Sequence, residues 1–129
     1  MARVLVSSNA PWESTVGYSR AVRVGPHVYV AGTTGIDEHG SVVGGARAQT
    51  LRALEIIEMA LSQAGAQLSD VVRTRMFVTD IRQWEAIGQA HGEVFGEIRP
   101  ASTVVEVKGL VRPDLLVEIE ADAIVEDGQ

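Results

Sequence analysis

The chain has 129 residues, of which 46% are hydrophobic and 22% are charged, which is ordinary for one globular domain and excludes a disordered chain. Its formal net charge of −6 argues against a protein that coats nucleic acid. The absence of cysteine excludes disulfides and cysteine metal sites and fits a reducing compartment. No apolar run reaches the roughly 18 residues of a membrane-spanning helix, and no signal pattern opens the chain. We therefore expect a cytoplasmic protein with a single domain over residues 1–129.

The N-terminal part of the chain predicts three strands. Arg3 to Val6 is a short apolar run typical of an edge strand, and Ser7 to Thr15 is rich in residues that favour a loop. Tyr18 to Val24 and His27 to Ala31 are typical of strands, and Gly25-Pro26 between them predicts the turn of a hairpin.

The rest of the chain alternates between helices and strands. Apolar residues recur every three or four positions from Ala46 to Ala64, which predicts an amphipathic helix. Val71 to Thr79 is rich in strand formers, and Arg82 to Gly96 predicts a second helix. Ser102 to Val107 and Leu115 to Val125 predict two final strands joined by a long turn. This order predicts an α+β fold, a mixed β-sheet with two helices packed on one face.

The last predicted strand alternates strictly between apolar and acidic residues. A period of two places Glu118, Glu120 and Asp122 in one row, with roughly 7 Å between neighbours. Three like charges in a row cost free energy unless water, cations or an arginine compensate them. The row is therefore either a solvated face or part of a site.

Six segments carry more specific motifs. They are GYSRAV from Gly17, VYVAGTTG from Val28, AQT from Ala48, AGAQLSDVVRTRMFVTD from Ala64, RPASTVVEV from Arg99 and LVEIEADA from Leu116. In this order, and over nearly the whole chain, they resemble the Rid family of small YjgF-type proteins. Its members include deaminases of reactive enamine and imine intermediates, and others are named endoribonuclease L-PSP. The resemblance implies the chorismate-mutase-like Rid fold, a homotrimer, and ligand clefts between neighbouring subunits.

The resemblance also implies a set of site residues. In the deaminating members, an arginine two residues after the motif's proline holds the substrate carboxylate through two hydrogen bonds. Ser102 occupies this position here, which removes about 1.5–3 kcal/mol of charge-assisted hydrogen bonding to an amino-acid-derived imine. Glu118 matches the carboxylate that activates water. Tyr18 matches a tyrosine that borders the cleft of family members. Gly32 matches a position where the backbone approaches the ligand closely, and the backbone amide of Val104 matches a hydrogen-bond donor to the substrate.

Arg75 is a further candidate for substrate binding, on the same predicted strand face as Arg73 and Phe77. It would replace the missing charge if it pointed into the cleft. The alternative is an ion pair with the row of carboxylates, because acids and arginines on adjacent strands commonly pair. The three histidines lack metal-ligand spacing, so we expect no metal ion, and we expect no other cofactor. Ser102 has no evident histidine or aspartate partner, so the sequence does not favour a nucleophilic serine triad.

Three functions remain open at this stage. The first is a hydrolase-like protein that acts on a small imine, enamine or related carbonyl metabolite with water activated by Glu118. The second is a non-catalytic, small-molecule-binding or regulatory trimer. The third, an RNA-cleaving translation inhibitor, is disfavoured by the net acidity and the lack of paired histidines. The expected partners are thus further copies of the chain and a metabolite, with neither nucleic acid nor membrane.

Overall fold

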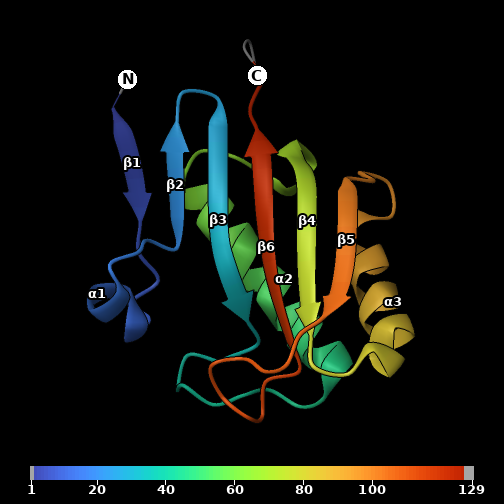
Figure 1. Cartoon of the computed structure of the whole chain (residues 1–129). Coiled ribbons are helices and arrows are strands. Elements are labelled where there is room, and N and C mark those ends of the chain that lie inside the picture. The colour runs from blue at the N-terminus through green and yellow to red at the C-terminus, as the bar shows by residue number, and fades with distance from the viewer. Residues whose placement is uncertain (1, 127–129) are drawn as a thin grey trace.

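A computed structural model describes residues 2–126 and shows a six-stranded β-sheet with two long helices behind it (Figure 1). The strands are β1 (Arg3–Val6), β2 (Ala21–Val24), β3 (His27–Thr34), β4 (Val71–Val78), β5 (Ala101–Glu106) and β6 (Val117–Ile124). The helices are α1 (Trp12–Val16), α2 (Ala46–Gln63) and α3 (Trp84–Phe95), with single 3₁₀ turns at Leu68–Asp70 and Ile81–Gln83.

The sheet has the strand order β1-β2-β3-β6-β4-β5. The pair β4 and β5 is parallel, and every other neighbouring pair is antiparallel. Helices α2 and α3 lie on the same face of this sheet (Figure 1). The predicted mixed sheet with two helices on one face is therefore confirmed. Within the described residues, no helix is long and apolar enough to cross a membrane.

The segment from Ser7 to Thr15, which we expected to be a loop, contains the additional helix α1. The carboxylate of Glu13 in its first turn accepts hydrogen bonds from the backbone N–H and the hydroxyl of Ser8. The helix ends at Gly17, whose φ of 86° lies in the left-handed region that glycine adopts without strain. These local bonds give five residues a helical turn despite the loop-forming residues around them.

The strand boundaries that differ most from the prediction lie in β2 and β3. The strand expected from Tyr18 begins only at Ala21, so Tyr18 and Arg20 lie in the segment that leads into β2. Strand β3 continues beyond Ala31 to Thr34, and its register with β6 shifts between Val30 and Thr33. Such a bulge bends a strand and re-aims its side chains, which becomes important at Gly32.

The hydrophobic core lies between the sheet and α2. Val117, Ile119 and the small residues that follow at every second position of β6 are at most 1% exposed. They face the apolar stripe of α2, where Leu54 and Ile57 are also buried. The predicted periodicities of two and of three to four are thus both realised. Because β6 alternates, Glu118 and the two acids after it lie on the opposite, helix-free face of the sheet.

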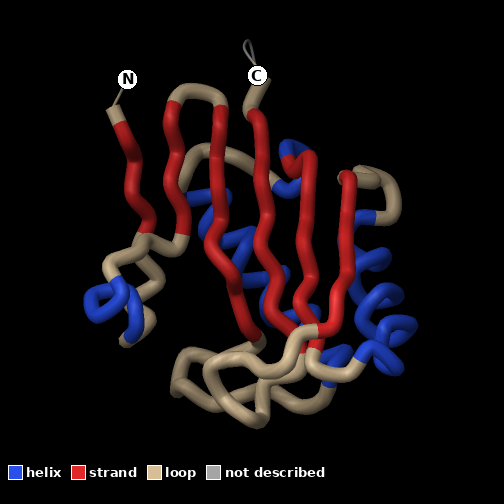
Figure 2. Tube along the Cα trace, in the orientation of Figure 1, coloured by secondary structure: helices blue, strands red, loops and turns tan. Residues whose placement is uncertain are grey.

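Two long loops, one before α2 and one before β6, gather at the same end of the sheet (Figure 2). Arg112 in the second loop donates a hydrogen bond to the backbone carbonyl of Gly40 in the first at 2.9 Å. The buried Gln49 of α2 donates to the carbonyl of Asp114 and accepts from the backbone N–H of Leu116. These bonds fix the chain that enters β6, and with it the position of Glu118.

Candidate functional site

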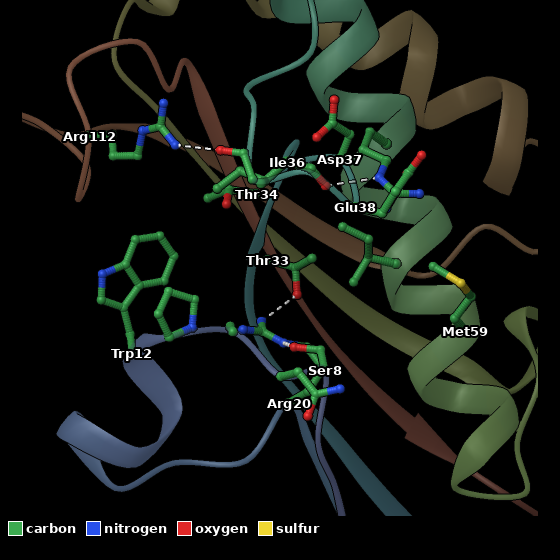
Figure 3. A pocket seen from close by; sticks show the side chains of 16 residues that line it. Ser8, Trp12, Arg20, Thr33, Thr34, Ile36, Asp37, Glu38, Met59 and Arg112 are labelled. Atoms are coloured by element: carbon green, nitrogen blue, oxygen red, sulfur yellow. Dashed lines mark hydrogen bonds and ion pairs between the residues drawn. The ribbon is translucent and has the colours of Figure 1, made fainter.

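Two cavities adjoin near the C-terminal end of β3. The larger, about 520 Å³, lies between the N-terminal loop and α2, where Trp12 and Met59 face it from opposite sides (Figure 3). The smaller, about 340 Å³, includes Tyr18, Gly32 and Glu118 in its lining. Both cavities share Trp12, Arg20 and Thr34. The smaller cavity thus brings together three of the residues that the sequence predicts to form a site.

Glu118 and Gly32 are in close contact across strands β6 and β3. A Cβ atom at position 32 would overlap with Oε2 of Glu118, so the carboxylate occupies the space that a side chain would take. The register shift between β3 and β6 falls at this point, and bulges of this kind are common beside active sites. The lack of a side chain at Gly32 therefore leaves room for the Glu118 carboxylate. The role of Gly32 in ligand binding stays a prediction.

The electrostatic environment of Glu118 suits a proton acceptor. Its side chain is half-buried, and this burial raises the pKa of its carboxyl above the ordinary value of 4.5. The positive charge of Arg20 acts against this change, and the negative charge of Glu120 adds to it. Within residues 2–126, no arginine, lysine or histidine lies within 4.0 Å of Glu118. A carboxylate with a raised pKa is a better base than an exposed one.

Arg20 is the residue of this site that sequence reasoning missed. Only 6% of it is exposed, and its Nη1 donates to the carbonyl of Gly32 at 2.6 Å and to Oγ1 of Thr33 at 2.9 Å. Its Nε donates to the hydroxyl of Ser8 at 3.2 Å. Its Nη2 donates to the hydroxyl of Tyr18 at 3.2 Å, and its guanidinium lies 5.4 Å from the centre of the Tyr18 ring. Arg20 belongs to the GYSRAV motif, but nothing in that motif distinguishes a buried arginine from a surface one.

Ser102 and Val104 lie far from this cavity within the same chain. They belong to β5, at the edge of the sheet, and β4 separates β5 from β6, the strand that carries Glu118. At roughly 4.8 Å between neighbouring strands, two steps correspond to about 10 Å. Ser102 is also paired with the fully buried Thr74 and so faces the helices, whereas Glu118 faces away from them. One chain alone does not bring Ser102 or Val104 to Glu118.

Ser102 is linked to a histidine through Thr74, a connection that the sequence did not indicate. The hydroxyl of Thr74 donates to Oγ of Ser102 at 2.7 Å and lies 2.9 Å from Nε2 of His91. Because Thr74 has one hydroxyl hydrogen, His91 donates to Thr74 in this arrangement. Burial lowers the pKa of His91 below its usual 6.5. The sequence did not indicate this link because the three residues come from three elements, and no spacing along the chain connects them.

Arg75 forms the ion pair that we considered as the alternative to ligand binding. Its Nη1 lies 3.1 Å from Oε1 of Glu120 and 3.3 Å from Oδ2 of Asp122. It lines neither of the two cavities. Arg75 thus compensates two of the three acids in the row and leaves Glu118 to the cavity. Its predicted role in substrate binding stays a prediction.

No group of three or more His, Asp or Glu side chains within residues 2–126 is arranged to hold a metal ion. The smaller cavity offers the chemistry of its own lining. A half-buried carboxylate lies beside the backbone of Gly32, a tyrosine hydroxyl and a buried guanidinium. This set can position a polar ligand and move a proton.

Comparisons with known proteins show the family and agree with the fold. A family model described as Endoribonuclease L-PSP matches residues 7–125. The crystal structure of a YjgF/YER057c/UK114 family member from Mycobacterium tuberculosis has a TM-score of 0.89 and 56% identity, covering 96% of this chain and 100% of that chain. The chain belongs to the Rid/YjgF family. The predicted family is thereby confirmed.

Two other Rid-family relatives broaden the comparison. A protein of Acinetobacter baylyi named 3-aminoacrylate deaminase RutC is 44% identical over 110 residues, which are 84% of this chain and 86% of that protein. The crystal structure of a Rid-family protein from Yersinia pestis is 32% identical with a TM-score of 0.86 and covers 96% of this chain and 100% of that chain.

Proposed function

We propose that this Rid-family protein hydrolyses a small imine or enamine to a carbonyl compound and ammonia, with Glu118 activating the attacking water. The observation that carries the proposal is the Glu118 carboxylate itself. It is half-buried in a cavity and held over Gly32, and it is the acid of its row that Arg75 does not pair with. The relative named 3-aminoacrylate deaminase supports the substrate class.

The proposed reaction needs one group that accepts a proton and returns it. An enamine that takes a proton at carbon, or an imine that takes one at nitrogen, becomes an iminium ion. Glu118 then removes a proton from water as the water oxygen bonds to the iminium carbon, giving a neutral carbinolamine. Glu118 returns this proton to the nitrogen, and the carbon–nitrogen bond breaks to release ammonia. The hydroxyl group loses its own proton to the Glu118 carboxylate as it becomes the carbonyl, and Glu118 then releases to solvent the proton that the substrate first took up. No metal or oxidant enters this balance.

The site that we propose is completed by a second copy of the chain in a homotrimer. The family resemblance implies such clefts, and Ser102 and Val104 lie on the β5 edge, where they cannot meet Glu118 of their own chain. On the helix-free face of the sheet, Tyr29 is 52% exposed and Val105 is 42% exposed. A neighbouring subunit would cover both side chains. In this arrangement β5 of one subunit borders the Glu118 cavity of the next.

The experiment that tests this proposal is ammonia release from freshly generated 2-iminobutanoate and 3-aminoacrylate. We expect the wild-type protein to accelerate release and Glu118→Gln to lose at least about 100-fold, the usual contribution of a general base. Asp122→Asn is the matched control. Asp122 lies on the same face of β6 as Glu118, but it pairs with Arg75 and does not line the cavity. The proposal would be contradicted if ammonia were released no faster with the wild-type protein than in buffer alone, or if the Glu118→Gln variant were fully active.

A non-catalytic ligand-binding function is the second candidate, and Ser102 is the observation that favours it, because it lacks the charge of the arginine in deaminating members. A binder would raise its Tm with an added metabolite without consuming it. We do not propose RNA cleavage, although the name of the matching family model includes it, because the net charge of −6 opposes binding to a polyanion.

A further inference from the structure

A buried cation with no carboxylate in direct contact lies beside the proposed catalytic carboxylate. Arg20 is 6% exposed, and among residues 2–126 no carboxylate lies within 4.0 Å of its guanidinium. Its partners are neutral carbonyl and hydroxyl groups. The charge of Glu118 acts on Arg20 only from beyond this distance, and removing a charge from water is costly unless an opposite charge pairs with it closely. An anion bound in the adjoining cavity would provide a counter-ion in direct contact with Arg20.

One N–H group of Arg20 and the hydroxyl of Tyr18 remain free to donate to a ligand. A guanidinium has five N–H groups, and four of them are engaged by Ser8, Gly32, Thr33 and Tyr18. One N–H of Nη2 remains. Because the Tyr18 oxygen accepts from Nη2, its own hydroxyl hydrogen is also free to donate. The two donor atoms lie 3.2 Å apart, and both residues line the cavity that contains Glu118.

The other arginines of the two cavities do not offer the same charge. Arg52 is paired with Glu55 and lies 4.0 Å from Glu38, and Arg112 is paired with Asp114 at 2.9 Å. Arg112 lies at the far end of the larger cavity from Arg20 (Figure 3). Their charges are already compensated by acids, so Arg20 is the cation toward which an anionic ligand would be drawn.

We propose that Arg20 and Tyr18 together bind the carboxylate of the substrate, which makes the substrate a short 2-imino acid or its enamine tautomer. Two neighbouring donors suit the two oxygens of a carboxylate, and a charged donor strengthens the contact. This role rests on the proposed function, since it assumes that the ligand of the Glu118 cavity is the imine. With the carboxylate at Arg20, the C=N group is directed toward Glu118, and the positive charge offsets the repulsion between the two acids. Arg20 thus replaces, from within the same chain, the charge that Ser102 lacks.

The test is equilibrium binding, measured by calorimetry, of 2-oxobutanoate and of its uncharged analogue 2-oxobutanamide. We expect the wild-type protein to bind the acid at least about tenfold more tightly than the amide, since a hydrogen bond to a charged group is worth that factor. Arg20→Gln should remove this preference. Arg23→Gln is the matched control, because Arg23 also donates only to backbone carbonyls, those of Gly25, Ala64 and Gly65, and lines neither cavity.

Two results would overturn the role of Arg20: a wild-type protein with no preference for the acid, or an Arg20→Gln variant that keeps it. If Arg20→Gln does not fold, Tyr18→Phe decides, because it removes one of the two donors and leaves the cation. The preference should then fall about threefold, and an unchanged preference would refute the proposal. Neither ligand is consumed, so acid-selective binding without ammonia release would reject the hydrolysis alone. Ammonia release without acid selectivity would reject the role of Arg20 alone.

Discussion

The two halves of the predicted site are organised differently. At the β3–β6 half, Glu118 lies against Gly32, and Arg20 bonds to the carbonyl on the other side of the same glycine. At the β5 half, Ser102 stands on an edge strand and is linked through Thr74 to a histidine of α3. The first half holds a carboxylate and a cation in one cavity, while the second offers a neutral hydroxyl. In the reaction that we propose, the charges lie with Glu118 and Arg20, and β5 of a neighbouring subunit shapes the cleft.

The largest effect should follow from filling the space at Gly32. In Gly32→Ala the new methyl group would overlap with the Glu118 carboxylate. Because the clash involves the end of a flexible side chain, we expect the carboxylate to move and the fold to survive. Ammonia release should fall by about 100-fold, as for loss of the base, with a Tm close to that of the wild type. Full activity would show that the Glu118–Gly32 contact does not position the base.

The pH dependence of the reaction should reveal the environment of Glu118. Burial raises the pKa of this carboxyl above 4.5, so its active, ionised form is lost at a higher pH than for an exposed glutamate. The rate constant kcat/KM should therefore fall as the pH decreases through this raised pKa. Below the pKa it should fall about tenfold for each pH unit. The same shift makes the carboxylate destabilising above that pKa, because the folded state binds the proton more tightly than the unfolded state. A profile with its midpoint below 4.5 would contradict the assigned environment.

Much of the first half was predictable from the sequence, and the second half was less so. The alternation of β6 placed Glu118 on the face away from the core, because side chains in a strand have a period of two. The motif GYSRAV identified Tyr18, but not the burial of Arg20, which depends on the bulge that turns the Gly32 carbonyl toward it. The link from Ser102 to His91 joins three elements that only the folded chain brings together.

A smaller effect is expected when the network at β5 is cut. Thr74→Val preserves the shape of a fully buried side chain but removes the hydroxyl that joins Ser102 to His91. We expect the free energy of unfolding to fall by about 1 kcal/mol, the usual contribution of a buried hydrogen bond. Denaturant unfolding would measure it, and ammonia release should change much less than in Gly32→Ala. A loss of activity as large as that of Gly32→Ala would place this network in the chemistry.

The smallest effect is expected at Arg75. Its ion pairs with Glu120 and Asp122 are partly exposed, with 39% of the Arg75 side chain accessible, and such pairs contribute less than about 1 kcal/mol. Arg75→Gln should therefore lower the free energy of unfolding by less than that amount in a denaturant titration. If ammonia release fell tenfold instead, Arg75 would contact the substrate, as in the predicted role in substrate binding.

The central claim is that Glu118 of one subunit acts in a cleft bordered by β5 of another, and mixed trimers test it most directly. Glu118→Gln lacks the base, and Ser102→Glu places a negative charge on β5 that would repel a substrate carboxylate. Each variant alone should be inactive. When the two are refolded together, clefts that combine the intact Glu118 of one chain with the intact β5 of the other should recover a measurable fraction of wild-type ammonia release. Mixed trimers that remain as inactive as the separate variants would contradict the claim.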